Sequence, residues 1–119
     1  MTAAEYRYLQ AIEQIKREKG KVIMSDIAAK LTYARASVYK KLLSLEQQGY
    51  IVKDDGKHIS VTKKGELEYE TLSKFTKTCA DILVQHTGLD KKLVMHDAVN
   101  MACVLSSRCR TALCGENSN

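Results

Sequence analysis

The chain has 119 residues, of which 45% are hydrophobic and 28% charged, and it contains no Trp. This length suits one small globular protein and is too short for two independent domains. The longest apolar run, residues 101–105, is far below the roughly 18–20 residues of a membrane span, and no charged-then-apolar leader opens the chain. We therefore expect a cytoplasmic protein with no membrane contact.

The charge balance favours a polyanionic partner without establishing one. Nineteen Lys and Arg residues against 14 Asp and Glu residues give a formal charge of +5. The absence of Pro and the presence of only six Gly favour long helices over a turn-rich sandwich or barrel. The four cysteines all lie in the last third, and no pair has the CxxC spacing of a zinc or redox motif, so we expect reduced thiols.

Two helices are predicted in the first 31 residues. An apolar stripe predicts a helix over residues 3–19, and Gly20 follows its basic last turn as a stop signal. Ser25 precedes Asp26 and a second apolar stripe that ends at Leu31. We therefore expect Ser25 to be the N-cap of a short helix of about two turns.

A third helix follows a brief turn at residues 32–34. Its apolar side chains recur at i, i+4 and i+7, and it ends at the Gln47-Gln48-Gly49 stop. These apolar positions are Val38, Leu42 and Leu45.

A β-hairpin is predicted directly after this helix. Residues 50–53 are β-prone, residues 54–56 form an Asp-Asp-Gly turn signal, and residues 58–61 alternate polar with apolar side chains. Thr62 then caps a long helix that ends near Gly88.

One more helix is predicted over residues 90–114, with an apolar stripe at Val94, Ala98, Met101 and Leu105. The sequence thus divides into residues 1–63, a winged helix-turn-helix, residues 64–114, a helical dimerisation and effector region, and residues 115–119, a flexible tail. The expected fold class is mainly α: a winged helix-turn-helix followed by a two-helix dimerisation region.

The order of three helices and a hairpin predicts binding to double-stranded DNA. No acid occurs between Asp26 and Glu46, so phosphates would not be repelled from the start of the third helix. Free N–H groups beside Ser25 and the basic hairpin tip could hold further phosphates. The candidate DNA-binding residues are Ser25, Arg35, Ser37, Tyr39, Lys40, Lys41, Lys57 and His58.

Two other classes of function are less consistent with the sequence. A winged helix that serves as a protein-protein interaction module predicts an acidic or apolar recognition face, against which Arg35, Lys40 and Lys41 argue. An enzyme predicts paired carboxylates, a nucleophile with its base or a phosphate-binding Gly loop, and none of these is present. We expect a DNA-binding transcription regulator that is not an enzyme.

Six segments spread over nearly the whole chain have the residues of a known family: Tyr8–Ile12, Ser25–Leu31, Ser37-Val38, Leu45–Tyr50, Val61–Glu66 and Thr87–Asp90. The segment Val61–Glu66 is shared with other winged helices, whereas the Gly88-Leu89-Asp90 turn is more specific to this family. With these segments the sequence resembles the iron- and manganese-dependent repressors related to the diphtheria toxin repressor. The resemblance implies a homodimeric repressor on a palindromic operator, with the two C-terminal helices at the dimer interface.

The resemblance also implies that the metal ligands of that family are largely replaced. Where its members carry carboxylate, His, Met or Cys ligands, this chain has few hard donors, and Arg7 adds a positive charge. Activation by iron or manganese is therefore not expected. The carried-over positions hold Arg7, Gln10, Thr76, Ala80, Met95, Val99, Ala102 and Cys103.

A thiol or soft-metal site is the remaining alternative for an effector. Cys79, His96 and Cys103 offer sulfur and imidazole donors that suit zinc, copper(I) or a heavy metal. The competing interpretation is that Cys79 is a small core residue and that His96 lies on a solvated face. We therefore expect no resident cofactor, with a thiol- or soft-metal-responsive regulator as the alternative.

Overall fold

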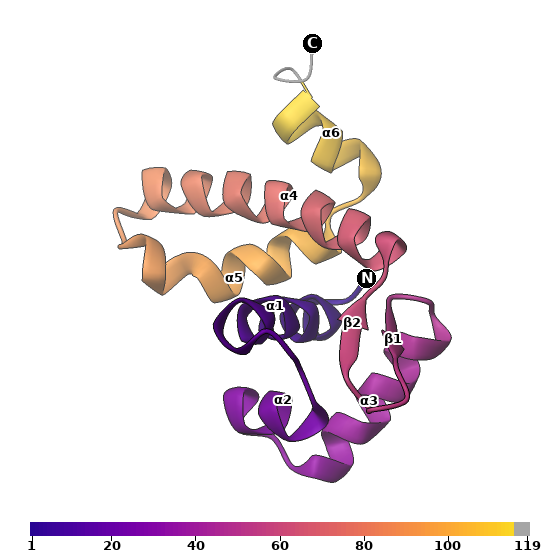
Figure 1. Cartoon of the computed structure of the whole chain (residues 1–119). Helices are drawn as coiled ribbons and strands as arrows, with labels where there is room; N and C mark the ends of the chain where they lie inside the picture. Colours follow the sequence, from indigo (N-terminus) through magenta and orange to yellow (C-terminus); the bar gives the residue numbers. More distant parts are fainter. Residues whose placement is uncertain (116–119) are drawn as a thin grey trace. The chain divides into compact units, whose positions relative to one another are not determined.

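The computed structural model describes residues 1–115 and contains six helices and one two-stranded hairpin (Figure 1). The expected tail lies outside the described residues from residue 116 on. Two compact units are present, Thr2–Tyr69 and a second that begins at Glu70. The elements are α1 (Ala3–Lys19), α2 (Met24–Leu31), α3 (Arg35–Gln47), β1 (Ile51–Lys53), β2 (Ile59–Val61), α4 (Lys63–Thr87), α5 (Lys91–Val104) and α6 (Ser107–Gly115).

The first unit is a winged helix, which confirms the expected fold class. Helix α1 packs against α2 and β2, α2 against α3, and α3 against β1. The hairpin is antiparallel, with Val52 opposite Ser60, and the N–H of Ile59 also bonds the Val22 carbonyl at 2.8 Å. The segment between α1 and α2 is thereby tied to the wing. The large core side chains of this unit with less than 2% exposure are Leu9, Ile12, Val22, Ile27, Val38, Leu42, Leu45 and Ile51.

Helix α1 has a cap at each end. The Thr2 hydroxyl accepts a hydrogen bond from the Glu5 N–H at 3.1 Å, and the Glu5 carboxylate accepts one from the Thr2 N–H at 2.8 Å. This reciprocal capping box satisfies two N–H groups that the helix leaves unpaired. Gly20 ends the helix in the left-handed region, at φ 84°, as the sequence predicts.

The start of α4 is held close to the start of the wing. The Thr62 hydroxyl accepts from the Gly65 N–H at 3.0 Å and donates to the Gly49 carbonyl at 2.6 Å. The predicted cap at Thr62 is therefore confirmed. A Cβ atom on Gly65 would lie 2.3 Å from the Tyr50 carbonyl oxygen, so only Gly fits at this position.

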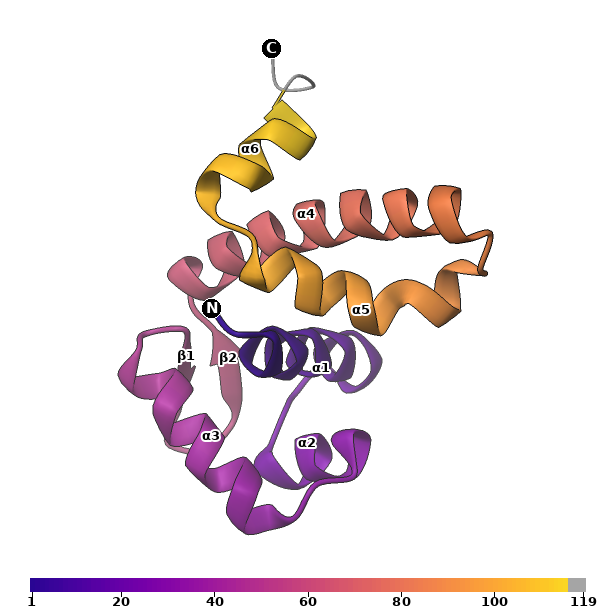
Figure 2. The ribbon, with the colours of Figure 1, turned by 180° about the vertical axis from the view of Figure 1, so that it is seen from behind.

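In the second unit, α4 and α5 run antiparallel, side by side, in both views (Figures 1 and 2). Gly88 allows the turn between them with φ 74°, and its N–H bonds the Val84 carbonyl at 2.9 Å. The buried side of α5 consists of Val94, Ala98, Val99 and Ala102, so the apolar stripe is rotated away from the predicted Met101 and Leu105.

The prediction of one helix over residues 90–114 is wrong, because the chain breaks between α5 and α6. Leu105 is extended, with ψ 140°, and the Ser106 hydroxyl accepts a bond from the Cys109 N–H at 3.2 Å. The Arg110 side chain folds back and donates to the carbonyls of Ala102 and Cys103 at 3.0 and 3.4 Å. A serine cap and an arginine that satisfies the exposed carbonyls thus replace one turn of continuous helix.

None of the helices among residues 1–115 combines the length and apolar character that a bilayer crossing requires.

Candidate nucleic-acid interface

Helix α3 turns its apolar stripe into the core and its basic side outward. Successive helix residues are about 100° apart, so Lys40 lies opposite Val38 and Leu42. Val38 and Leu42 are buried, whereas Lys40 is exposed. Arg35, Ser37 and Tyr39 are exposed as well, so four of the predicted contacts on this helix are accessible to a duplex.

Lys41 lies on the flank of α3 that faces the start of α1. It is half-buried, and its positive charge contributes to the environment of the buried Glu5 carboxylate. Gln48 donates to that carboxylate at 2.7 Å and ties α3 to α1. Burial alone would raise the pKa of Glu5, but the bonds from Gln48 and Thr2 and the charge of Lys41 lower it below its ordinary value. Lys41 is therefore less accessible to a duplex than the other four candidates on this helix.

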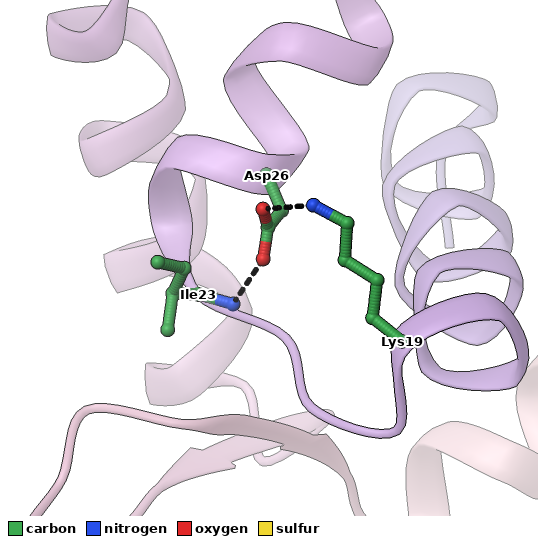
Figure 3. A network of polar contacts seen from close by, with 3 residues as sticks. All are labelled: Lys19, Ile23 and Asp26. Carbon is green, nitrogen blue, oxygen red and sulfur yellow. Dashed lines mark hydrogen bonds and ion pairs between the residues drawn. The ribbon is translucent and has the colours of Figure 1, made fainter.

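The start of α2 differs from the sequence prediction: Ser25 is not the N-cap. The helix begins at Met24, and the capping position is Ile23, which is extended with φ −124° and ψ 165°. The Asp26 carboxylate accepts the Ile23 N–H at 3.3 Å and an ion pair from Lys19 at 2.9 Å (Figure 3). The carboxylate of Asp26, the third residue of the helix, thus takes the capping role that was expected of a serine hydroxyl. It also neutralises Lys19.

The Asp26 cap predicts an acid-sensitive contribution to stability. The hydrogen bond from Lys19 is the main reason why the pKa of Asp26 lies below its ordinary value. Since the folded pKa is lower than the unfolded one, this stabilisation is complete above about pH 4 and is lost as pH falls through the folded pKa. Asp26→Asn should therefore cost roughly 0.5–1 kcal/mol at pH 7 and clearly less near pH 2. Urea unfolding at both pH values checks this, and an equal cost at both would contradict it.

At the tip of the wing, Lys57 is free to contact a ligand, whereas His58 is bonded to Asp54. Lys57 is exposed and takes the left-handed conformation, with φ 63°. His58 is half-exposed, its N–H bonds the Asp54 carboxylate at 2.8 Å, and its ring nitrogen lies 3.3 Å from the same group. The backbone bond from His58 is the main cause that lowers the pKa of Asp54. Lys57 is thus the better placed of the two for a phosphate.

A cleft of about 610 Å³ lies between the start of α2, helix α3 and the wing. We call it the wing cleft. Four apolar side chains, Ile23, Met24, Leu42 and Ile59, form part of its lining.

Charged and aromatic groups also line the wing cleft. The Lys53 ammonium lies 5.9 Å from the centre of the Tyr39 ring, which is 51% exposed. Among the described residues, Arg35, Lys53 and Lys57 have no ion-pair partner, so three unpaired cations line one opening. Ser25 also lines it. No motif could indicate this cleft, because its lining comes from three separate segments.

The thiol and imidazole candidates of the second unit differ in how far they are exposed to solvent. Cys79 is fully buried, Cys103 half-buried and His96 exposed. Burial raises the pKa of the Cys79 thiol and the nearby Cys114 adds to this rise, while Arg110 opposes it. Cys79 is therefore held in its unreactive thiol form. Cys114, which the sequence did not single out, is buried, and its Sγ lies 3.2 Å from the Thr78 hydroxyl oxygen.

Several positions carried over from the resembled family are occupied by core side chains. Ala80, Val99 and Ala102 are buried, and the buried Thr76 hydroxyl has no hydrogen-bond partner. Within residues 1–115, no three His, Cys, Asp or Glu side chains gather where a metal ion could be held. Methyl groups and a lone hydroxyl do not suit a hard divalent cation.

Comparison with known proteins supports the fold. No protein-family model matches the chain, and no curated protein matches it. Among solved structures, the hypothetical protein SSo2273 from Sulfolobus solfataricus is 20% identical with a TM-score of 0.80, over 98% of this chain and 89% of that one.

Metal-dependent regulators have the same fold. The metal-dependent transcriptional regulator MtsR is 22% identical with a TM-score of 0.82, over 99% of this chain and 55% of its own. The manganese regulator SloR is 18% identical with a TM-score of 0.80, over 96% of this chain and 53% of its own. The chain thus spans about half the length of these two regulators. The likeness confirms the fold expected from the resemblance.

Proposed function

We propose that this protein is a sequence-specific, duplex-DNA-binding transcription regulator that acts in the cytoplasm. The observation that carries the proposal is the exposed, acid-free N-terminal half of α3, with Arg35 and Lys40, next to the basic wing residues Lys53 and Lys57. A recognition helix enters the major groove, and wing cations contact the flanking phosphates. The regulators MtsR and SloR have the same fold, which supports this proposal.

Selection from a random duplex pool tests sequence specificity. The full chain should enrich one motif, and a dimer should enrich it as an inverted repeat. Enrichment of no motif would contradict a sequence-specific regulator. Capture of a protein by the same face, without DNA binding, would instead favour the interaction module.

We further propose that the protein is a homodimer through its second unit. Leu72 and Val94 are already buried in the single chain, so they are not free to form an interface. Leu89, Leu93 and Val104 are 48%, 66% and 80% exposed, so we place the interface on these apolar side chains. Sedimentation at micromolar concentration should show a dimer, and Leu93→Lys should shift it towards monomer. A wild-type monomer under these conditions would refute this part.

Manganese(II) and iron(II) are not expected to change DNA affinity. The positions at which the resembled family has ligands hold Thr76, Ala80, Val99 and Ala102, whose side chains offer no carboxylate or imidazole. DNA affinity measured with and without manganese(II), under reducing conditions, should agree within about twofold. A tenfold or greater activation would contradict the proposal. Zinc(II), copper(I) and peroxide, tested on wild type and Cys103→Ser, address the thiol alternative.

A further inference from the structure

The wing cleft has an apolar lining that duplex DNA does not require. Phosphates and most base-edge groups are polar, so they account for Arg35, Lys53 and Lys57 but not for the rest of the lining. Ile23 is 39% exposed, although it stands at the start of α2, where a polar capping residue is usual. An apolar side chain at this position is therefore available to a second ligand.

The size and composition of the wing cleft suit a small molecule. Its volume of about 610 Å³ lies within the roughly 300–1,000 Å³ typical of ligand pockets. Such pockets are mainly apolar and have a few polar groups that orient the ligand. Leu42 and Ile59, both buried, give the cleft a firm floor, because their positions are set by the core.

The charge of the wing cleft selects an anion. Arg35, Lys53 and Lys57 contribute three positive charges, and no ion pair within the described residues neutralises them. The single acid of the lining, Asp54, is already engaged by the N–H and the ring of His58. The Tyr39 ring and the Lys53 ammonium above it add a face on which a flat aromatic group can stack.

We propose that the wing cleft binds a small aromatic carboxylate and that the bound acid excludes DNA. Its ring lies against Ile23, Met24 and Tyr39, and its carboxylate meets the cations. Arg35, Tyr39 and Lys57 are also proposed DNA contacts, so the two ligands compete for the same side chains. The exclusion of DNA rests on the proposed function, whereas the binding of the acid does not.

The test measures the binding of 2-naphthoate to the full chain in the absence of DNA. The chain contains no Trp whose fluorescence could report binding, so the fluorescence anisotropy of the naphthoate ligand serves as the readout. The uncharged 2-naphthamide is the matched control ligand. A single site should bind 2-naphthoate at least about tenfold more tightly than the amide, because only the acid pairs with the cations.

Two variants separate the apolar contact from the charged one. Ile23→Ser introduces a favoured N-cap residue, so the fold should be kept, and it should weaken naphthoate binding about fivefold with little change in DNA affinity. Arg35→Gln should weaken the binding of both ligands. In competition, naphthoate should displace a labelled duplex at the concentration at which it binds directly.

The outcomes distinguish the two proposals. Equal affinity for the amide, or an unchanged affinity in Ile23→Ser, would overturn the site. Octanoate binding as tightly as naphthoate would overturn the aromatic part of it. Naphthoate binding with the expected variant pattern in a protein that binds no duplex would support the site and refute the DNA-binding function instead.

Discussion

Lys40→Glu is expected to reduce duplex affinity by about hundredfold or more. Lys40 is exposed and stands opposite the buried stripe of α3, on the side that would face the groove if α3 is the recognition helix, as proposed. The substitution removes a favourable contact and places a negative charge against phosphates, and each lost contact costs about 1–3 kcal/mol. In a dimer the loss occurs at both half-sites. Electrophoretic mobility shift with a selected duplex checks this.

The matched control for this substitution is Lys77→Glu. Lys77 is an exposed lysine of α4 in the second unit, so the change in net charge is the same. DNA affinity should fall by no more than about threefold, through the long-range field alone. Equal losses in both variants would show that net charge, and not α3, governs the interaction.

Gly65→Ala is expected to destabilise the winged unit by at least about 2 kcal/mol. The new Cβ would lie 2.3 Å from the Tyr50 carbonyl oxygen and 2.8 Å from Val61 Cγ1. Neither neighbour is the free end of a flexible side chain, so α4 must move away from the wing, and overpacking of this kind typically costs 1–3 kcal/mol. Urea unfolding of the full chain measures the change.

Gly56→Ala is the control for the added methyl group. Its Cβ would meet the His58 ring at 3.1 Å, and that ring is half-exposed and can turn aside. We expect a change below about 1 kcal/mol. If Gly56→Ala lowered the free energy of unfolding as much as Gly65→Ala does, the cause would be the loss of a glycine and not the contact with Tyr50.

The predictions from sequence were most accurate where local chemistry decides the structure. Gly20, Gly49 and Gly88 all take positive φ, and Thr62 caps α4, because these choices depend on residues within one turn. The capping box of Thr2 and Glu5 had the same kind of signal, a Thr three residues before a Glu, and was overlooked.

Non-local contacts explain the errors. The break at Leu105 has no Gly or Pro to mark it, and its carbonyls are satisfied by the distant Arg110. The start of α2 was misplaced because Asp26 reaches both the Ile23 N–H and Lys19 of the preceding helix. Such contacts are invisible to periodicity, which reads one segment at a time.

The exposed basic side of α3 can be predicted from the sequence pattern, whereas the wing cleft cannot. The stripe of Val38, Leu42 and Leu45 places Lys40 outward by helix geometry alone. The cleft requires Ile23, Arg35 and Lys53 to meet from three segments that only the folded chain brings together.

The salt dependence of duplex binding tests the central claim most directly. If Arg35, Lys40, Lys53 and Lys57 each neutralise a phosphate, log affinity should fall against log salt with a slope of about −4 per protomer. Between about 50 and 200 mM salt this predicts a loss of about hundredfold or more, with a shallower slope in Lys57→Gln. An affinity that does not change with salt, or an unchanged slope in that variant, would contradict the interface.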